Sequence, residues 1–317
     1  MKAEALLLDP GLHLAMQPCP LCAGVAFQTL ARHDRHHLGL HTVGCEHCGL
    51  MQINPRPSAQ GLDTFYQLHY RRLYQNTIRP DQQYVTRFQK QARLQVTAQY
   101  LLNSLRISRQ GRLLDYGCSE GSLFVALREA GFTGSLFGVE PNATFGRFAA
   151  TQGHATVTQT LPTETALDGI VLNHVLEHLA DPIQLLRRLS PLLDGNGLLY
   201  VDVPDAREYR NPGDLHLAHL WHFTPATLCH VIEQAGFEVV TCEAHRPPHH
   251  PRSIRLVARP VLVPRHHPSM ASAEHAAWQV MKTVEQRAWF WGLRHRLAQV
   301  ALLREGVRLL RRLGTRQ

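Results

Sequence analysis

The sequence predicts an α/β protein with a mostly parallel sheet, because strand-like apolar runs alternate with amphipathic helical stretches from residue 112 onward. The last two expected strands flank a His- and Pro-rich loop that is too short for a crossover helix, so these two strands should pair antiparallel. The expected strands are residues 112–116, 135–140, 169–173, 197–203, 237–242 and 254–258. The expected helices are residues 122–130, 143–151, 182–192 and 225–235.

The N-terminal 58 residues contain four of the seven cysteines, arranged as two C-x-x-C pairs. Cys19 and Cys22 form the first pair, and Cys45 and Cys48 form the second. Four thiolates complete the closed tetrahedral shell that Zn²⁺ favours, so residues 1–58 are predicted to be a module with a structural zinc ion. The alternatives are a disulfide or unrelated buried thiols, and a zinc site in which a histidine such as His47 replaces one cysteine.

Residues 59–108 are expected to form a helical connector between this module and the α/β region. Aromatic side chains are interleaved there with Arg and Gln, and Pro80-Asp81 interrupts the helical pattern. The aromatic residues are Tyr66, Tyr70, Tyr74, Tyr84, Phe88 and Tyr100.

The most informative segment follows the first strand of the α/β region. Asp115 ends that strand, Gly117, Cys118 and Gly121 form a turn of small residues, and a helix begins directly afterwards. Glycines allow a ligand to approach the backbone, and a helix N-terminus offers unpaired N–H groups. The next strand ends at Glu140, nineteen residues after Gly121, where an acid can accept hydrogen bonds from both hydroxyls of a ribose.

This segment resembles the first motif of class I S-adenosylmethionine-dependent methyltransferases, D-x-G-C-G-x-G, with Ser119 in place of the middle glycine. The resemblance extends over about residues 109–260, through DGIV at 168–171, NHVLEH at 173–178 and PLLDGNG at 191–197. It implies that residues 109–262 form a Rossmann-like, seven-stranded, mostly parallel sheet with an antiparallel last strand. It also implies that S-adenosylmethionine is bound by Asp115, Gly117, Cys118, Gly121, Glu140 and Asn173.

The N-terminal segment resembles the zinc module found on a bacterial branch of this family that includes sugar-modifying methyltransferases. It carries the sequences CPLC, CEHCGL and NPRP within residues 19–57. The resemblance implies a small-molecule acceptor, such as an activated sugar or a secondary metabolite.

Two other enzyme classes share parts of the glycine-containing loop. The sequence GCSEG at 117–121 fits the nucleophile elbow of α/β-hydrolases, with Ser119 as the nucleophile, but it lacks the preceding core strands and oxyanion loop. A nicotinamide dehydrogenase shares the acid after the second strand, but Leu123 stands where its third glycine is expected. A tight turn that binds no ligand is the remaining alternative.

The candidate catalytic residues follow the expected strand at residues 169–173. They lie at its carboxyl end, where ligands of open α/β sheets bind. Methyl transfer needs alignment of donor and acceptor and, in most cases, removal of a proton. His174 and His178 are therefore predicted to act as general bases, with Glu177 orienting them. For each histidine a surface or purely structural role is the alternative, because the chain contains 21 histidines. Other polar residues expected at the same edge are Asp202, Asp205, His216, His219 and His222.

The positive charge of the chain is concentrated at its C-terminal end. The net charge is +8, but residues 244–317 hold 14 Arg and Lys against 3 Asp and Glu, which leaves residues 1–243 with 19 against 22. Leu and Val recur at helical spacing between 293 and 310, so residues 263–317 are expected to be a basic helical tail. We expect this tail to dock onto the core or a second copy, with an anionic membrane surface or a nucleic acid as alternatives.

The sequence as a whole predicts a cytoplasmic methyltransferase. Residues 1–16 lack the features of a signal peptide, and the cysteines do not follow a secretory pattern. An RNA base methyltransferase whose zinc module holds RNA is less favoured, because the first 243 residues carry a net negative charge and a segment of the N-P-P-Y type does not follow the fourth strand. A non-catalytic scaffold that retains the donor fold is the third possibility.

Overall fold

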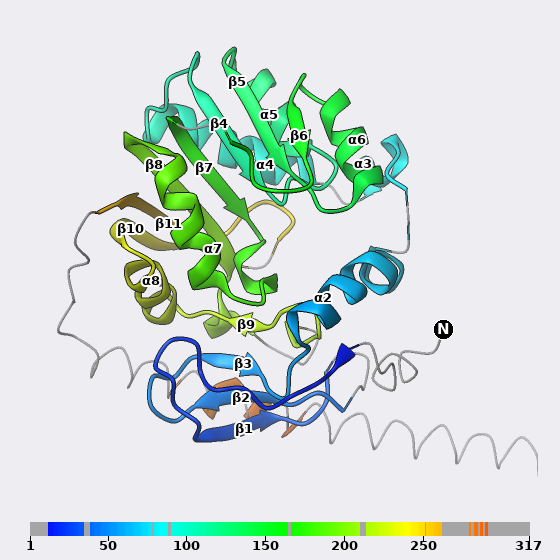
Figure 1. Ribbon diagram of the computed structural model, residues 1–317, viewed down its shortest axis with the longest axis vertical. Coiled ribbons are helices and arrows are strands. Elements are labelled where there is room, and N and C mark those ends of the chain that lie inside the picture. The colour runs from blue at the N-terminus through cyan, green and yellow to red at the C-terminus, as the bar shows by residue number, and fades with distance from the viewer. Residues whose placement is uncertain are drawn as a thin grey trace, which may run out of the picture.

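The computed structural model describes residues 12–34, 39–75, 77, 79–87, 90–163, 166–209, 214–250 and 252–261, with eight further residues between 279 and 290. These residues form a seven-stranded sheet with helices on both faces, and a smaller four-stranded sheet that lies beneath it in Figure 1. A helical segment, residues 59–104, runs from the small sheet to the large one.

The large sheet has the strand order β10-β11-β8-β7-β4-β5-β6. All neighbours from β8 to β6 are parallel, whereas β11 is antiparallel to both β8 and β10. This confirms the predicted fold class. The strands are β4 (Arg112–Tyr116), β5 (Ser135–Val139), β6 (Thr156–Thr158), β7 (Leu167–Asn173), β8 (Leu193–Pro204), β10 (Phe237–His245) and β11 (Ser253–Pro260).

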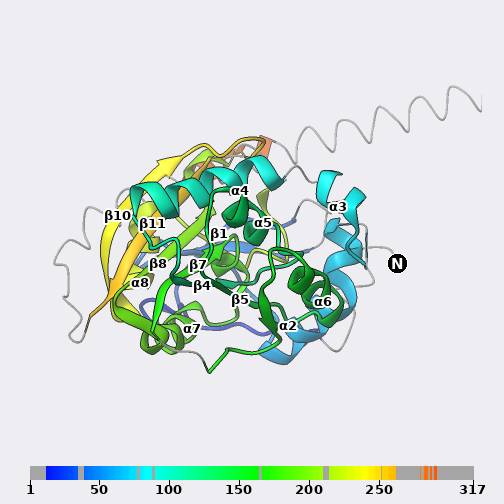
Figure 2. The ribbon, with the colours of Figure 1, turned by 90° about the horizontal axis from the view of Figure 1, so that it is seen from above.

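Each central strand is apolar on both sides because helices cover both faces of the sheet. Leu113 and Val171 belong to the core cluster that contains α4 (Lys90–Gln99) and α5 (Ser122–Glu129). The adjacent Leu114 and Leu172 belong to the cluster that contains α7 (Pro182–Leu189) and α8 (Pro225–Gln234). Figure 2 shows α4 and α7 on opposite sides of the sheet, and Figure 1 shows α6 (Ala143–Thr151) beside β6.

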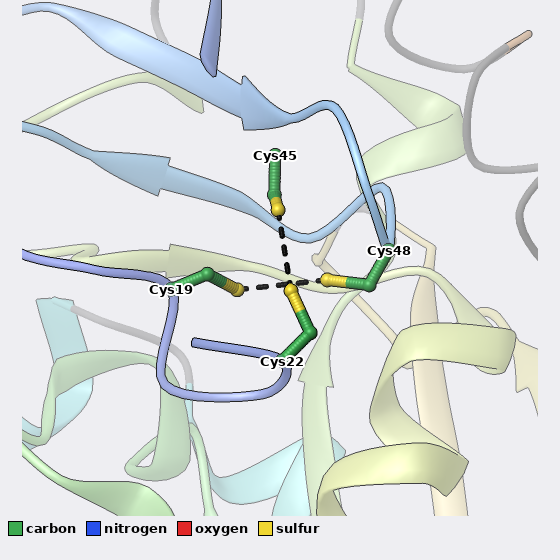
Figure 3. A group of neighbouring side chains, drawn as sticks. All are labelled: Cys19, Cys22, Cys45 and Cys48. Carbon is green, nitrogen blue, oxygen red and sulfur yellow. Dashed lines mark hydrogen bonds between the residues drawn. The ribbon is translucent and has the colours of Figure 1, made fainter. Parts of the chain in front are cut away.

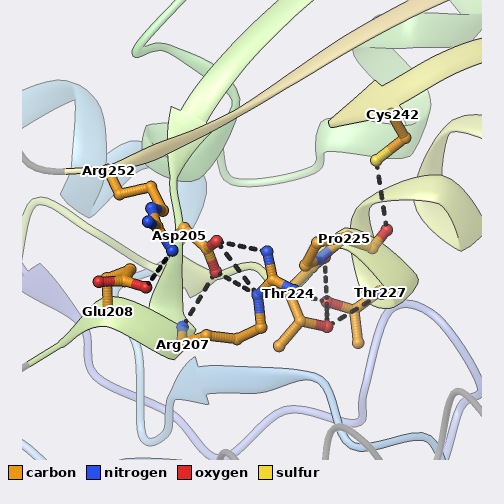
Figure 4. Close-up of polar contacts among 8 residues, drawn as sticks. All are labelled: Asp205, Arg207, Glu208, Thr224, Pro225, Thr227, Cys242 and Arg252. Atoms are coloured by element: carbon orange, nitrogen blue, oxygen red, sulfur yellow. Dashed lines mark hydrogen bonds and ion pairs between the residues drawn. The ribbon is translucent and has the colours of Figure 1, made fainter. Parts of the chain in front are cut away.

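Polar side chains cap the N-termini of three helices of this domain, α6, α7 and α8. Asn142 accepts hydrogen bonds from the backbone N–H groups of Thr144 and Phe145 at the start of α6, and Asp181 caps α7 in the same way. At α8, Thr224 and Thr227 form a reciprocal capping box ahead of the first turn (Figure 4). These caps fix where the loops at the carboxyl edge of the sheet end.

The small sheet combines the cysteine module with a strand from the α/β domain. Its order is β1 (Phe27–Ala31), β2 (Thr42–Cys45), β3 (Met51–Ile53) and β9 (Trp221–His222), all antiparallel. Trp221 is almost fully buried, and its indole N–H donates to the Leu179 carbonyl, while the Arg56 guanidinium lies 4.7 Å from the centre of its ring. The two parts of the chain are therefore joined by backbone pairing as well as by side chains.

The segment between the two sheets is helical. It consists of α2 (Ala59–Phe65), a π-helical segment η2 (Tyr66–Gln75), α3 (Gln82–Arg87), α4 and a second π-helical turn η3 (Tyr100–Ser104). Three short 3₁₀ segments follow β7, α7 and β8, namely η4 (Leu176–His178), η5 (Ser190–Leu192) and η6 (Ala206–Glu208).

Most of the predicted basic tail, residues 263–317, lies outside the described residues. Within the described part, Val284 is buried in a cluster with Met51 of the small sheet and Leu215, and the Arg287 guanidinium donates to the Tyr209 carbonyl. This piece of the tail therefore packs on the body of the protein. No helix in the part of the chain that the structure describes is both long and apolar enough to cross a bilayer.

Candidate active site and cysteine cluster

The four cysteines of the two C-x-x-C pairs lie together at one end of the small sheet (Figure 3). Their sulfur atoms are all within 4.8 Å of one another, with 3.5 Å between Cys19 and Cys48 and 3.5 Å between Cys22 and Cys45. Four thiolates bound at 2.3 Å around a tetrahedral zinc would be ~3.8 Å apart. The arrangement therefore matches the size of a zinc shell, and His47 is not a member of the group.

The backbone around the cluster forms two tight turns. The N–H of Ala23 donates to the carbonyl of Cys19, and the N–H of Gly49 donates to that of Cys45. Gly24 passes so close to the sulfurs that an added Cβ would lie 3.2 Å from the Cys22 sulfur. Hydrogen bonding with the neighbouring thiols, together with burial, raises the pKa of Cys48, so a full set of thiolates needs a cation among them.

A cavity of about 690 Å³ lies between the carboxyl edge of the large sheet and the connector. At one end it is lined by the loop after β4, and at the other by the segment after β7 and by residues 214–219. Of the connector residues, Tyr66, Tyr70, Arg71, Tyr74, Lys90 and Arg93 face this cavity.

The loop after β4 has the backbone geometry that its glycines allow. Gly117 and Gly121 have φ values of +79° and +80°, and an added Cβ at Gly117 would lie 2.6 Å from Val175. Ser119, which replaces the usual middle glycine, also lies in the left-handed region at φ +51°. Its hydroxyl accepts a hydrogen bond from Arg71 rather than facing an imidazole, which does not fit a hydrolase nucleophile.

Two of the predicted donor-binding residues face the core rather than the cavity. Cys118 is buried in the cluster beneath α5, and burial raises the pKa of its thiol, so it is a packing residue. Asp115 is also buried, and burial together with the charges of Glu120 and Glu140 raises its pKa to about 8. Glu120 in turn is held by Lys90, whose ammonium lies 2.9 Å from its carboxylate.

The carboxylate of Glu140 lies at the cavity wall, directly after β5. It accepts a hydrogen bond from the backbone of Asn142 and lies 3.4 Å from the Arg71 guanidinium. Arg71 also lies over the ring of Phe145, with its guanidinium carbon 3.7 Å from the ring centre. Asn173 reaches the same cavity from the end of β7, and its side-chain oxygen is buried and has no hydrogen-bond partner among the described residues.

The structure brings the three predicted catalytic residues together after β7. His174 has φ +55° and its backbone N–H donates to the carbonyl of Asp202 on β8. Its ring lies between two carboxylates, with Nδ1 3.4 Å from Glu177 and Nε2 3.6 Å from Asp202. Strained backbone of this kind is often found at active sites.

A backbone carbonyl fixes the orientation of His178. Its Nδ1 lies 2.6 Å from the carbonyl oxygen of Ala218, and because that oxygen can only accept, Nδ1 carries the proton. The opposite nitrogen, Nε2, therefore holds a lone pair that points toward Glu177 at 3.8 Å. Burial lowers the pKa of His178 to about 4, so this lone pair is available at neutral pH.

Burial shapes the protonation of the whole cluster. The carboxyl of Glu177 is fully buried, and burial raises its pKa to about 8. Burial also lowers the pKa of His174 and of His219 well below the usual value. Among the described residues neither oxygen of Glu177 has a hydrogen-bond partner, although three imidazoles lie within 4.0 Å of one oxygen.

Several residues of this cavity were not predicted from the sequence. Arg93 on α4 is buried near Asp202, Glu120 and Glu177, and burial lowers its pKa. Tyr66, Tyr70 and Tyr74 recur every four residues, which is the pattern of one helix face, and this spacing was the available signal. The position of Arg71 beside Glu140 had no signal in the sequence.

Residues 88–242 match the model of a family described as a methyltransferase domain. The match includes the loop after β4 and most of the large sheet, and it agrees with the class of enzyme that this loop predicted, a methyltransferase.

Solved structures of similar fold include methyltransferases of low sequence identity. The 1,6-didemethyltoxoflavin-N1-methyltransferase of Burkholderia thailandensis, with 1,6-didemethyltoxoflavin and S-adenosylhomocysteine bound, is 20% identical; the match covers 54% of this chain and 79% of that one, with a TM-score of 0.44. The magnesium protoporphyrin IX methyltransferase of Synechocystis PCC 6803 is 16% identical, over 62% of this chain and 97% of that one, with a TM-score of 0.45. None of the curated proteins matches the sequence.

The buried histidines predict a loss of stability in acid. Burial lowers the pKa of His222 from 6.5 to about 3, so the unfolded chain binds a proton at this residue at a pH where the folded protein does not. Above pH 6.5 neither state is protonated at His222, and the full free energy of unfolding is present. As the pH falls from 6.5 toward 3, protonation of the unfolded chain lowers the free energy of unfolding by up to about 1.4 kcal/mol per pH unit.

In the variant His222→Asn, the number of protons taken up on unfolding in this pH range should be lower by close to one, so the free energy of unfolding should depend less steeply on pH. Urea unfolding at pH 7.5, 6 and 5 measures it, and His154→Asn, at an exposed position, is the matched control. Equal slopes in His222→Asn and the wild type would contradict the neutral buried state of His222.

Proposed function

We propose that the protein transfers a methyl group from S-adenosylmethionine to a small-molecule acceptor that binds in the cavity at the carboxyl edge of the sheet. The observation that carries this proposal is that one cavity is lined by residues from both predicted sets, the donor-binding set and the catalytic set. Gly117 and Glu140 line it at the donor end, and His174 and His178 line it at the acceptor end. A donor and an acceptor bound there would share one enclosed space, which in-line transfer requires.

The residues at the donor end fit S-adenosylmethionine. The carboxylate of Glu140 is placed to accept hydrogen bonds from the ribose hydroxyls, and the buried oxygen of Asn173 has no protein partner. Gly117 and Gly121 shape the loop, whereas Asp115 and Cys118 support it from below. When bound, the donor supplies a methyl carbon whose bond to sulfur breaks with the electron pair left on sulfur as the bond to the acceptor atom forms.

The residues at the acceptor end position the acceptor and receive its proton. His174 and His178 are both uncharged at neutral pH because burial lowers their pKa values, so each can accept a proton. Glu177 orients the two rings, with its carboxyl oxygen 3.4 Å from His174 and 3.8 Å from His178. Tyr66, Tyr70 and the rest of the connector wall limit the access of water.

The volume of the cavity and the net charge of residues 1–243 favour a small acceptor over RNA. A cavity of about 690 Å³ lies within the range of small-molecule sites. Residues 1–243, which include the zinc module and most of the methyltransferase domain, carry a net negative charge, which disfavours a polyanion. An activated sugar or a secondary metabolite is the acceptor class that we propose. We place the protein itself in a reducing compartment such as the cytoplasm.

We further propose that Cys19, Cys22, Cys45 and Cys48 bind a structural zinc ion. The sulfurs fit a tetrahedral shell, and all four positions of that shell are filled by protein. Such a site supplies folding free energy, about 10 to 16 kcal/mol in zinc-binding peptides, rather than a reactive metal.

Metal removal tests the cysteine site. We expect wild-type protein treated with a mild chelator to retain one equivalent of zinc in elemental analysis, and Cys45→Ser to lose it together with thermal stability. Cys229→Ser, outside the cluster, is the control and should keep the zinc. Zinc-free wild-type protein with oxidised cysteine pairs would contradict the assignment.

Calorimetry tests the donor site. Glu140→Gln should weaken binding of S-adenosylmethionine by about 10- to 150-fold, since a charged hydrogen bond contributes about 1.5–3 kcal/mol. Glu243→Gln, at an exposed carboxylate of β10, should bind like the wild type. A wild-type protein that binds neither S-adenosylmethionine nor S-adenosylhomocysteine would overturn the proposed donor.

A screen with donor carrying a labelled methyl group tests the acceptor class. Label should appear in a product from nucleotide sugars or small metabolites and not in RNA. With that acceptor, His174→Ala should lower kcat by about 10²- to 10⁴-fold with little change in donor affinity, as expected for loss of a general base. His249→Ala, at an exposed position outside the cavity, is the control. Label found in RNA alone would contradict the proposal.

A further inference from the structure

A second group of metal-ligating atoms lies at the acceptor end of the cavity. One oxygen of Glu177, one nitrogen of His178 and one nitrogen of His219 are all within 4.8 Å of one another. The Nε2 atoms of His178 and His219 lie 3.8 Å and 4.0 Å from the same oxygen, Oε1 of Glu177. All three residues are among those that line the cavity, so the group lies in the wall of the proposed substrate space.

We propose that Glu177, His178 and His219 hold a divalent transition-metal cation that binds an oxygen atom of the methyl acceptor. This inference deepens the proposed methyl transfer and rests on it for the identity of the acceptor. The metal site itself rests on the geometry of the three side chains.

The first argument is the position of His178 Nε2 opposite an oxygen of Glu177. The proton of His178 is on Nδ1, where it is donated to the Ala218 carbonyl, so Nε2 is an acceptor, and the Glu177 oxygen nearest to it lies 3.8 Å away. Two atoms 3.8 Å apart are too distant for a shared proton to make a hydrogen bond, but a cation between them attracts both. Metal-bound histidines usually donate their second N–H to a carbonyl or carboxylate, as His178 does here.

The second argument is burial. Glu177 is fully buried, and among the described residues neither of its oxygens has a hydrogen-bond partner. An ionised carboxylate at such a buried position is stabilised when it is paired or coordinates a metal. The ring of His219 is held beside it by contact with His216, at 3.9 Å between ring centres, and with the edge of His178 at 4.8 Å.

The donor set indicates which cation would bind. Two imidazole nitrogens and one carboxylate suit Zn²⁺, Co²⁺, Fe²⁺ or Ni²⁺, whereas Mg²⁺ prefers oxygen ligands alone. Bonds of about 2.0–2.2 Å place ligand atoms ~3.0–3.5 Å apart, so the three side chains need to close by a fraction of an ångström. Three protein ligands leave at least one position open, which is typical of a metal that binds substrate.

The acceptor class follows from this open position. An acceptor that binds the cation presents an oxygen, and a hydroxyl beside a second oxygen, as in a vicinal diol or an α-hydroxycarbonyl, can occupy two positions. The cation lowers the pKa of the bound hydroxyl. Because His178 is then a metal ligand, His174 is left to receive the proton, and the metal keeps its oxidation state throughout.

Cobalt binding tests the site without reference to turnover. After mild chelation has cleared the cavity and left the cysteine zinc, Co²⁺ should bind with one equivalent per chain and give visible absorption without a thiolate charge-transfer band. His219→Ala and the isosteric Glu177→Gln should each weaken this binding by at least 100-fold, more than the loss of an outer-shell residue costs. His250→Ala, which lines the same cavity but is outside the group, should bind Co²⁺ like the wild type.

Two outcomes would overturn the metal site: Co²⁺ binding that is equal in wild type and His219→Ala, or a wild-type protein that takes up no Co²⁺ beyond the cysteine site. Binding of S-adenosylmethionine measured on the same samples separates this failure from failure of the proposed function. A protein that binds the donor but no cobalt loses only the metal proposal, whereas one that binds cobalt but no donor loses the methyl-transfer proposal.

Discussion

The pairing of β9 with β3 is the interaction on which the arrangement of the site depends. It joins two residues from the α/β domain to the edge of the cysteine module, with Met51 opposite His222 and Gln52 opposite Trp221. The backbone N–H of Leu220 also donates to the carbonyl of Glu177, so the same segment is tied to the loop after β7. The carbonyl of Ala218, which fixes the proton of His178, and the ring of His219 both belong to this segment. The cysteine module therefore supports the acceptor end of the cavity although it supplies none of its reactive groups.

The connector closes the other side of the cavity, and its charges are matched to those of the α/β domain. Arg71 lies against Glu140, Lys90 against Glu120, and Arg93 is buried near Asp202 and Glu177. Each of these cations comes from the helical segment, and each acid lies at the carboxyl edge of the large sheet, with Asp202 near the end of β8 and the others in the segments after β4, β5 and β7. Positive charges on one wall of the cavity therefore face negative charges on the other. These pairs hold the two walls together, because breaking a buried pair leaves an uncompensated charge.

The fold was predictable because the two sequence patterns that indicate it, apolar strand-like runs and capped amphipathic helices, are local in sequence. Alternating apolar runs and capped helices gave the strands and helices within a few residues, and β6 was missed since it has only three residues, Thr156–Thr158, at a sheet edge. The four cysteines were predictable for a similar reason, because two short turns place the ligands whatever the rest of the chain does.

The candidate site was predictable only on the side that follows directly from the strands. His174, Glu177 and His178 were found because they leave β7 at the edge where ligands bind. The tautomer of His178, the approach of His219 and the position of Arg71 depend on segments that are distant in sequence, and periodicity carries no information about such contacts. Cys118 shows the opposite case, since its place in the motif predicted a binding role and the structure places it in the core.

The small sheet has a consequence for how the chain acquires its structure during synthesis. Three of its strands are made early, but the fourth, Trp221–His222, is separated from them by more than half of the chain. Pairing between such distant segments must wait until both have left the ribosome. All four cysteines of the cluster are made early, but the sheet beside them is complete only when the α/β domain has largely been synthesised.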